Sequence, residues 1–126
     1  MIVAVIGSRS FDGDVAYDRL CAVLGACAID GVVSGGAKGT DRLAERYALE
    51  FALKLQVFLA EWDKFPGKTA AYERNKLIVE AADAVVAFWD GESKGTRMTM
   101  KLCWERRKPL MIVRTDMLDM GETDGD

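Results

Sequence analysis

The chain has 126 residues, half of them hydrophobic, which suits one domain with a continuous core. It contains no histidine, which excludes imidazole general bases, serine–histidine–aspartate triads and most zinc sites. The formal net charge of −3 is uneven, because residues 116–126 hold five acids and no base. The nearly balanced remainder has no basic stripe, so we expect nucleic acid to be an unlikely partner.

The apolar runs are too short to span a bilayer, and we expect no membrane partner. The apolar start, residues 1–7, lacks a basic leader and is typical of a first strand rather than a signal peptide. These features predict a cytoplasmic protein. The three cysteines lack metal-ligand spacing, so we expect free thiols, no metal and no cofactor.

Strand-like and helical segments alternate along the chain. The expected strands cover residues 1–6, 32–34, 55–60, 84–89 and 109–113. The first expected helix begins with Asp14 as its capping residue. The other three expected helices cover about residues 40–53, 70–81 and 94–106. This order predicts an α/β protein with a Rossmann-like, doubly wound, parallel five-stranded sheet and helices on both faces. We expect residues 1–115 to form the domain and residues 116–126 an acidic, disordered tail. Because such folds often pair through helix faces, we also expect a homo-oligomer.

Three glycine- and hydroxyl-containing turns directly follow strands. They are Gly7-Ser8-Arg9-Ser10-Phe11, Gly35-Gly36-Ala37-Lys38-Gly39-Thr40-Asp41 and Trp89-Asp90-Gly91-Glu92-Ser93-Lys94-Gly95-Thr96. All three fall at the carboxyl edge of the expected sheet, where helix starts offer unpaired N–H groups to anions. A single turn of this kind serves only tight packing as often as it contacts a ligand. Three such turns that converge predict a phosphate-binding crevice.

The expected ligand-binding residues lie in these turns or in the segment Tyr72-Glu73-Arg74-Asn75, whose polar residues could equally form a solvated helix face. They are Gly7, Ser8, Arg9, Gly35, Gly36, Lys38, Gly39, Thr40, Asn75, Trp89, Gly91, Ser93, Gly95 and Thr96. Trp89 could stack on a base or pack in the core. The dinucleotide fingerprint G-x-G-x-x-G is absent after the first strand, and Gly67-Lys68-Thr69 lacks the earlier glycine and the leading strand of a P-loop.

Four motifs in this order resemble the SLOG superfamily, and its small YspA-like branch most closely. They are Gly7-Ser8-Arg9, Ser34 to Asp41, Tyr72 to Asn75, and Ala82 to Thr96. The superfamily also includes the LOG phosphoribohydrolases and the Rossmann domain of the DNA-processing protein A family. The resemblance implies a Rossmann-like sheet and a nucleotide or nucleotide-derived ligand similar to AMP or ADP-ribose, which the chain would bind or sense.

The resemblance leaves two other functions open. One is a LOG-like hydrolase that cleaves the N-glycosidic bond of a nucleoside monophosphate, with Arg74, Asp90 and Asp41 as catalytic residues. Against it, Thr99 stands where LOG enzymes carry a glutamate, and N-glycosidic hydrolysis needs a carboxylate. The other is a single-stranded nucleic-acid binding module, against which the balanced charge and short chain argue.

Overall fold

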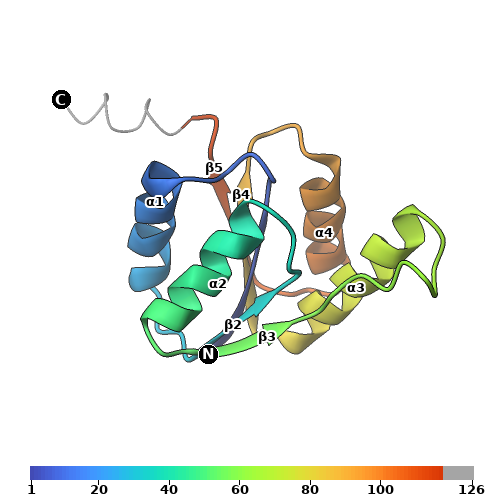
Figure 1. Cartoon of the computed structure of the whole chain (residues 1–126), viewed down its shortest axis with the longest axis horizontal. Coiled ribbons are helices and arrows are strands. Elements are labelled where there is room, and N and C mark those ends of the chain that lie inside the picture. The colour runs from blue at the N-terminus through green and yellow to red at the C-terminus, as the bar shows by residue number, and fades with distance from the viewer. Residues whose placement is uncertain (118–126) are drawn as a thin grey trace.

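Five parallel strands and four helices alternate along the part of the chain that the computed structural model describes, residues 1–117 (Figure 1). The strands are β1 (Ile2–Gly7), β2 (Gly31–Ser34), β3 (Lys54–Val57), β4 (Ala84–Trp89) and β5 (Leu110–Arg114). The helices are α1 (Asp14–Gly25), α2 (Thr40–Glu50), α3 (Lys68–Ala81) and α4 (Lys94–Glu105). The predicted α/β class and the order of elements are confirmed.

The strand order is β3-β2-β1-β4-β5, with every pair parallel. The chain runs from β1 outward to β3, then returns to place β4 beside β1, where Val5 pairs with Val86. This reversal puts α1 and α2 on one face and α3 and α4 on the other, because parallel crossovers are right-handed. The doubly wound topology therefore has its switch point at the carboxyl ends of β1 and β4, where ligands bind on sheets of this kind.

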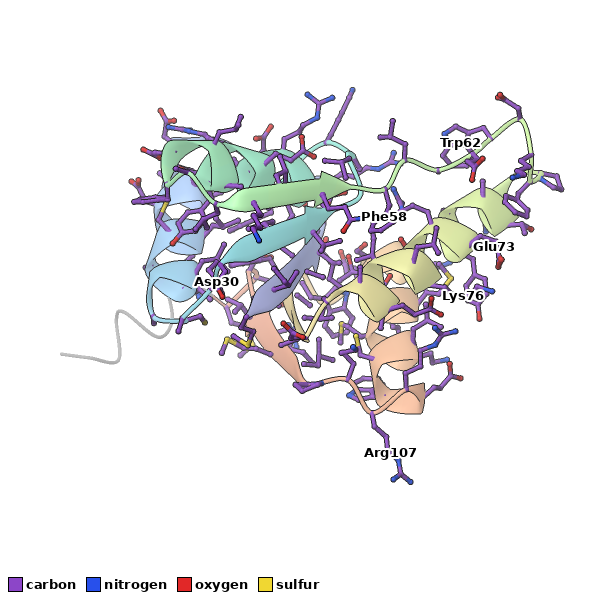
Figure 2. All side chains as sticks on the ribbon, turned by 90° about the horizontal axis from the view of Figure 1, so that it is seen from below. Asp30, Phe58, Trp62, Glu73, Lys76 and Arg107 are labelled. Carbon is purple, nitrogen blue, oxygen red and sulfur yellow. The ribbon has the colours of Figure 1, made fainter. Side chains whose placement is uncertain are left out.

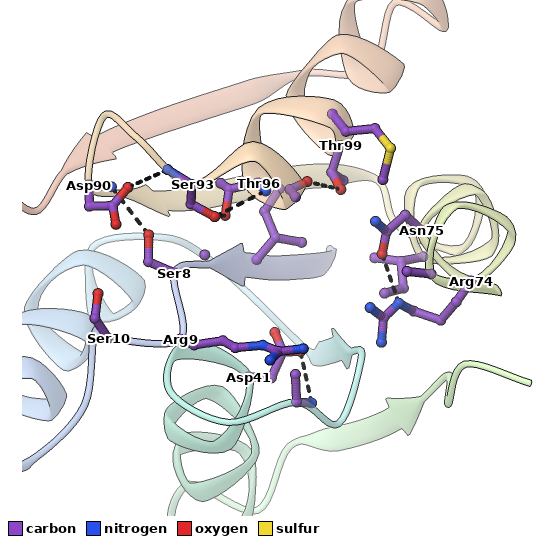
Figure 3. A pocket seen from close by; sticks show the side chains of 17 residues that line it. Ser8, Arg9, Ser10, Asp41, Arg74, Asn75, Asp90, Ser93, Thr96 and Thr99 are labelled. Carbon is purple, nitrogen blue, oxygen red and sulfur yellow. Dashed lines mark hydrogen bonds between the residues drawn. The ribbon is translucent and has the colours of Figure 1, made fainter. Parts of the chain in front are cut away.

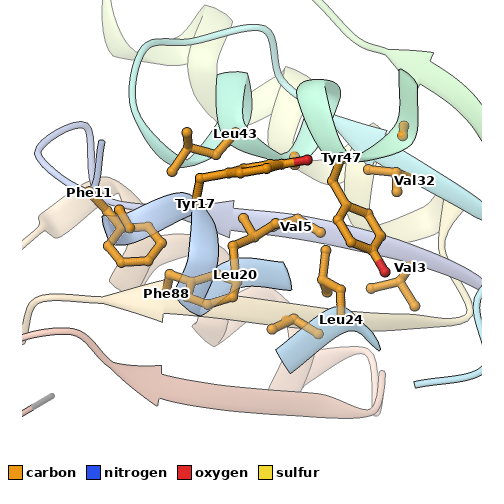
Figure 4. Packing of buried hydrophobic residues seen from close by; sticks show 14 residues of the cluster. Val3, Val5, Phe11, Tyr17, Leu20, Leu24, Val32, Leu43, Tyr47 and Phe88 are labelled. Atoms are coloured by element: carbon orange, nitrogen blue, oxygen red, sulfur yellow. The ribbon is translucent and has the colours of Figure 1, made fainter. Parts of the chain in front are cut away.

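The two faces of the sheet carry separate cores, which explains why the central strands are apolar at nearly every position. Val3 and Val5 point toward α1 and α2, where Phe88 of β4 stacks on Phe11 with ring centroids 5.0 Å apart (Figure 4). Ala4 and Ile6 point the opposite way, toward α3 and α4. β1 is thus buried from both sides, and its carboxyl end is held firmly between two layers.

The element boundaries differ from expectation mainly at helix ends. The expected cap by Asp14 is wrong: Gly13 precedes α1, no side chain caps the helix, and Asp14 is its first residue. α2 ends at Glu50, before a turn in which Ala52 adopts a positive φ of 53°. β3 ends at Val57 rather than at residue 60. These ends depend on local backbone geometry, which apolar periodicity does not encode.

The expected tail lies almost entirely in residues 118–126, outside the described residues, so the domain boundary stays a prediction. None of the helices in residues 1–117 is long and apolar enough to cross a membrane. The homo-oligomer and the cytoplasmic location also stay predictions.

Two strand-to-helix turns meet backbone to backbone at Gly39, which has a φ of +74°. A Cβ added there would lie 2.3 Å from the carbonyl oxygen of Arg9, closer than any real contact. We expect Gly39→Ala to lower the free energy of unfolding by about 2 kcal/mol or more, because both the backbone conformation and the space exclude a side chain. Urea unfolding measures the change.

Gly25 supplies the matched control, since nothing lies within 4 Å of a Cβ added there and its φ is not positive. Gly25→Ala should change the free energy of unfolding by less than about 1 kcal/mol. Equal effects of the two substitutions would show that the two turns are not tightly packed.

Candidate ligand site

A cavity of about 500 Å³ opens at the switch point, between the carboxyl end of β1, the start of α2, and helices α3 and α4 (Figure 3). Its polar lining comes from all four of these regions. The lining residues are Ile6, Gly7, Ser8, Arg9, Ser10, Ala37, Asp41, Ala71, Arg74, Asn75, Ile78, Asp90, Ser93, Gly95, Thr96, Met98 and Thr99. The volume falls within the range of small-molecule sites, about 300–1,000 Å³.

Ser8 joins the turns that build this cavity. Its backbone N–H donates to the Phe88 carbonyl at 3.1 Å, and its hydroxyl accepts from the Asp90 N–H at 3.3 Å. Its carbonyl accepts from both the N–H and the hydroxyl of Thr40, at 3.3 and 2.9 Å. Ser8 is 2% exposed, and its contacts fix the first turn against β4 and α2.

The start of α4 forms a second polar wall of the cavity. Ser93 caps the helix: its hydroxyl accepts from the Thr96 N–H at 3.5 Å and lies 3.1 Å from the Thr96 hydroxyl. Asp90 holds the preceding turn, because its carboxylate accepts the N–H groups of Glu92 and Ser93 at 2.8 and 2.7 Å. These backbone donors lower the pKa of Asp90. Its carboxylate is therefore ionised and occupied by the turn.

In the glycine-rich loop before α2, two backbone amides already donate to neighbouring side chains. The Ala37 N–H donates to Asp41 at 3.0 Å, and the Gly36 N–H donates to the Ser34 hydroxyl at 3.2 Å. Burial raises the pKa of Asp41, although the Ala37 N–H and the charge of Arg74 oppose the rise. Asp41 thus takes the place inside the loop where a ligand phosphate was expected.

Two guanidinium groups approach the cavity from opposite sides, Arg9 from the first turn and Arg74 from α3 (Figure 3). Arg74 donates to the Gly35 carbonyl at 2.8 Å and to the Asn75 amide oxygen at 2.7 Å. Burial lowers the pKa of Arg74, and the nearby charge of Arg9 lowers it further, while Asp41 opposes the shift. No salt bridge within residues 1–117 includes either arginine.

Trp89 lies away from the cavity lining. Its indole N–H donates to the Ser93 carbonyl at 3.1 Å, and Arg114 lies over its ring at 5.3 Å. Of the two roles considered for Trp89, the structure places it in packing contacts. Gly91 lies beside the same arginine, since a Cβ there would lie 2.5 Å from a guanidinium nitrogen of Arg114.

The structure brings most of the expected site residues together. The expected residues that line the cavity are Gly7, Ser8, Arg9, Asp41, Arg74, Asn75, Asp90, Ser93, Gly95 and Thr96. Those that do not line it are Gly35, Gly36, Lys38, Gly39, Thr40, Trp89 and Gly91. Gly35 is next to the lining residue Arg74, because a Cβ added to Gly35 would lie 2.7 Å from a guanidinium nitrogen of Arg74.

Sequence reasoning missed several lining residues: Ile6, Ser10, Ala37, Ala71, Ile78, Met98 and Thr99. Helical spacing could have found two of them, because Ala71 and Ile78 lie three residues before and four residues after Arg74 on one face of α3. For Thr99, the sequence indicates only that the glutamate of LOG enzymes is absent at this position. Its hydroxyl donates to the Gly95 carbonyl at 3.2 Å. Residues 1–117 contain no group of acidic or cysteine side chains that could hold a metal.

Comparison with known proteins identifies the family of this doubly wound chain. The family model described as "YspA, cpYpsA-related SLOG family" matches residues 1–65, and the chain belongs to this family. Gene 61 protein of Mycobacterium phage D29 is 40% identical over 76 residues, which cover 56% of this chain and 60% of the phage protein. The chain therefore spans less than two thirds of that relative.

Two solved structures share the fold. The DNA processing protein A of Streptococcus pneumoniae superposes with a TM-score of 0.74 at 21% identity, over 93% of this chain and 51% of that one. The protein of the same name from Helicobacter pylori gives a TM-score of 0.67 at 22% identity, over 96% of this chain and 73% of that one. The second structure describes a single-stranded DNA binding mode.

These findings correct the expectation that nucleic acid is an unlikely partner. A protein with this fold binds single-stranded DNA, so the fold does not exclude that function. The expectation was wrong because it used the basic stripe needed for duplex DNA, whereas single strands bind in local grooves by stacking and charge together. The family and its structural neighbours support nucleotide-related or nucleic-acid binding as the class of function.

The contributions of Asp41 and Asp90 to the free energy of unfolding should change with pH in opposite directions. The raised pKa of Asp41 means that ionisation costs stability, a cost that appears as pH rises above the ordinary value of 3.8. Asp41→Asn should therefore gain stability relative to the wild type between about pH 4 and about pH 7. The lowered pKa of Asp90 means that its charge stabilises the fold above 3.8, and the stabilisation is lost as pH falls through the lowered pKa.

Asp90→Asn should accordingly lose stability relative to the wild type near pH 7, with a smaller loss near pH 4. Urea unfolding of the three proteins at both pH values tests the pair. The same sign of pH dependence in both variants would contradict the assigned environments.

Proposed function

We propose that the cavity binds a nucleotide or nucleotide-derived ligand through its phosphate. The observation that carries the proposal is the pair of guanidinium groups, Arg9 and Arg74, which face one cavity with no salt bridge among residues 1–117. Arg74 is half-buried and Arg9 is exposed, and the neighbouring charge of Asp41 offsets part of the repulsion that Arg9 exerts on Arg74. A phosphate between the two guanidinium groups would accept charge-assisted hydrogen bonds from both.

The opposite wall supports the same position for the phosphate. The first turn of α4 offers the hydroxyls of Ser93 and Thr96 beside a positive helix end, and Ser8 and Ser10 add hydroxyls from the β1 turn. Asp41 repels an anion from the interior of the glycine-rich loop. The proposed phosphate therefore lies between α3 and the start of α4. Ala37 and Asp41 of the glycine-rich loop line the cavity on the side of α2.

The geometry favours binding over hydrolysis of an N-glycosidic bond. A hydrolase needs a carboxylate free to stabilise the positive centre or direct water. Asp90 is held by two backbone N–H groups, Asp41 by the Ala37 N–H, and Thr99 supplies no carboxylate. The catalytic roles of Arg74, Asp90 and Asp41 stay predictions. Release of free adenine from AMP, followed by chromatography, tests them.

Single-stranded nucleic acid is the second candidate, favoured by the Helicobacter pylori protein of the same fold and its described DNA binding mode. Arg9 lines the cavity, Lys38 and Lys94 are next to lining residues in the sequence, and all three are exposed. A strand neutralising several of these cations would bind with a steep salt dependence, whereas a single mononucleotide phosphate would show a shallow one. Titration at two salt concentrations separates the two candidates.

Arg74→Met should weaken the binding of AMP or ADP-ribose by about 10- to 100-fold, because hydrogen bonds to charged groups contribute ~1.5–3 kcal/mol. Titration calorimetry measures the affinity, and circular dichroism checks the fold, since Arg74 also contacts Gly35. Lys101→Met is the charge-matched control, because Lys101 is exposed on α4 outside the cavity lining.

Equal affinity of Arg74→Met and the wild type would place the ligand elsewhere. Absence of binding by the wild-type protein to AMP, ADP-ribose and a short single-stranded oligonucleotide would contradict the proposed function itself.

A further inference from the structure

Asn75 is a buried polar residue of α3, only 8% exposed, and it lines the cavity together with Ala71 and Ile78. These three residues lie on one face of the helix, because they are spaced by four and then three positions. Glu73 and Lys76 lie on the opposite face, paired with each other at 2.7 Å and turned away from the sheet (Figure 2). Of the two roles considered for this polar segment, a solvated helix face describes Glu73, whereas Asn75 faces the cavity.

A hydrogen bond from Arg74 fixes which end of the Asn75 amide is available to a ligand. The Arg74 Nε–H can only donate, and it lies 2.7 Å from the Asn75 Oδ1, so the amide oxygen is already occupied. Within residues 1–117, the Asn75 side chain forms this hydrogen bond and no other. Because buried polar groups are nearly always hydrogen-bonded, the two N–H donors of this amide call for an acceptor on a ligand.

Thr99 of α4 supplies the complementary group. It lines the same cavity and is 3% exposed. Its hydroxyl has a single proton, which it donates to the Gly95 carbonyl at 3.2 Å, so the lone pairs of the hydroxyl oxygen remain as acceptors. Figure 3 shows Asn75 and Thr99 together at one end of the cavity, with Ser8 at the other end. This end of the cavity therefore offers a donor and an acceptor.

The surroundings of these two polar groups are apolar and shielded from water. Ile78 follows Asn75 by about one turn of α3 and is 2% exposed, and half-buried Met98 precedes Thr99 on α4. Arg9, which helps to form the proposed phosphate site, is exposed. Apolar walls with a few fixed polar groups are typical of sites that orient a small organic ring. The exposed end thus suits the phosphate of a nucleotide, and the buried end suits its base.

We infer that the buried end of the cavity recognises the base of the nucleotide, with the Asn75 N–H₂ group donating to the base and the Thr99 Oγ1 accepting from it. This inference rests on the proposed function, because the phosphate site holds the other end of the ligand. The base must carry an acceptor beside a donor. Adenine has a ring nitrogen next to its exocyclic amine, and hypoxanthine has a carbonyl next to a ring N–H.

The test compares four ligands by titration calorimetry: ribose 5-phosphate, AMP, inosine 5′-monophosphate and purine riboside 5′-monophosphate. Purine riboside has neither the amine of adenine nor the ring N–H of hypoxanthine, so it gives Thr99 no donor. We expect the tighter of AMP and inosine 5′-monophosphate to exceed purine riboside 5′-monophosphate by about 10-fold, because an unpaired buried acceptor is costly. It should exceed ribose 5-phosphate by more. Which of the two binds more tightly identifies the donor as an amine or a ring N–H.

Two substitutions of similar shape assign the contacts. Thr99→Val removes the hydroxyl and should abolish the preference over purine riboside 5′-monophosphate, whereas Thr99→Ser keeps the hydroxyl and should retain it. Asn75→Leu removes the amide donors and should reduce the preference over ribose 5-phosphate by about 10-fold. Thr69→Val is the matched control, because Thr69 is exposed on the first turn of α3 and lies outside the cavity lining. It should change neither preference.

The outcomes separate this inference from the proposed function. Equal affinity of the wild type for ribose 5-phosphate and the three nucleotides would overturn base recognition while leaving the phosphate site in place. A Thr99→Val variant that keeps the wild-type preference, or a Thr99→Ser variant that loses it, would also overturn the inference. If none of the four ligands binds, the proposed function itself fails.

Discussion

The hydrogen bonds of Ser8 are the contacts on which the rest of the site depends. Its N–H reaches β4, its carbonyl receives two donors from Thr40, and its hydroxyl receives the N–H of Asp90. One buried residue thus joins the turns after β1, β2 and β4. The approach is possible only because neighbouring Gly7 has no side chain: a Cβ there would lie 2.4 Å from the Thr40 hydroxyl and 2.5 Å from the Phe88 carbonyl. The glycines of these turns serve first to bring backbone against backbone.

Asp41 changes the role that can be assigned to the glycine-rich loop. A loop with this composition is typically interpreted as a cradle whose amides bind phosphate. Here the Ala37 N–H already has an internal carboxylate, and the buried charge of that carboxylate lies in the neighbourhood of Arg9 and Arg74. The loop therefore satisfies its own Ala37 N–H with the Asp41 carboxylate, and this carboxylate contributes negative charge to the cavity lining. The place left for an anion is the space between the two guanidinium groups and the start of α4.

The fold could be predicted from the sequence because the central strands are apolar on both sides and the helices have clear periodicity. β4 was predicted to the residue, since Ala84–Trp89 is bounded by charged and glycine-containing turns. The convergence of the three turns followed from parallel topology alone. Which side chains of a turn face the cavity could not be predicted, because orientation depends on contacts between distant segments. Trp89 turns toward Ser93 and Arg114, and Lys38 lies outside the lining, although both are next to residues that reach it. The cavity between α3 and the segment that connects β3 to α3 could not be predicted, because this segment lacks periodicity.

Chemical-shift mapping of the ¹⁵N-labelled protein with a nucleotide tests the central claim most directly. If the phosphate lies between Arg74 and the start of α4, the largest perturbations will fall on the amides of Ser8 to Ser10 and Ser93 to Thr96 and on the Nε–H of Arg74. The Ala37 amide, already bound to Asp41, should move less. Perturbations concentrated at Gly36 to Gly39, with little change at Ser93 to Thr96, would contradict the account and return the phosphate to the glycine-rich loop.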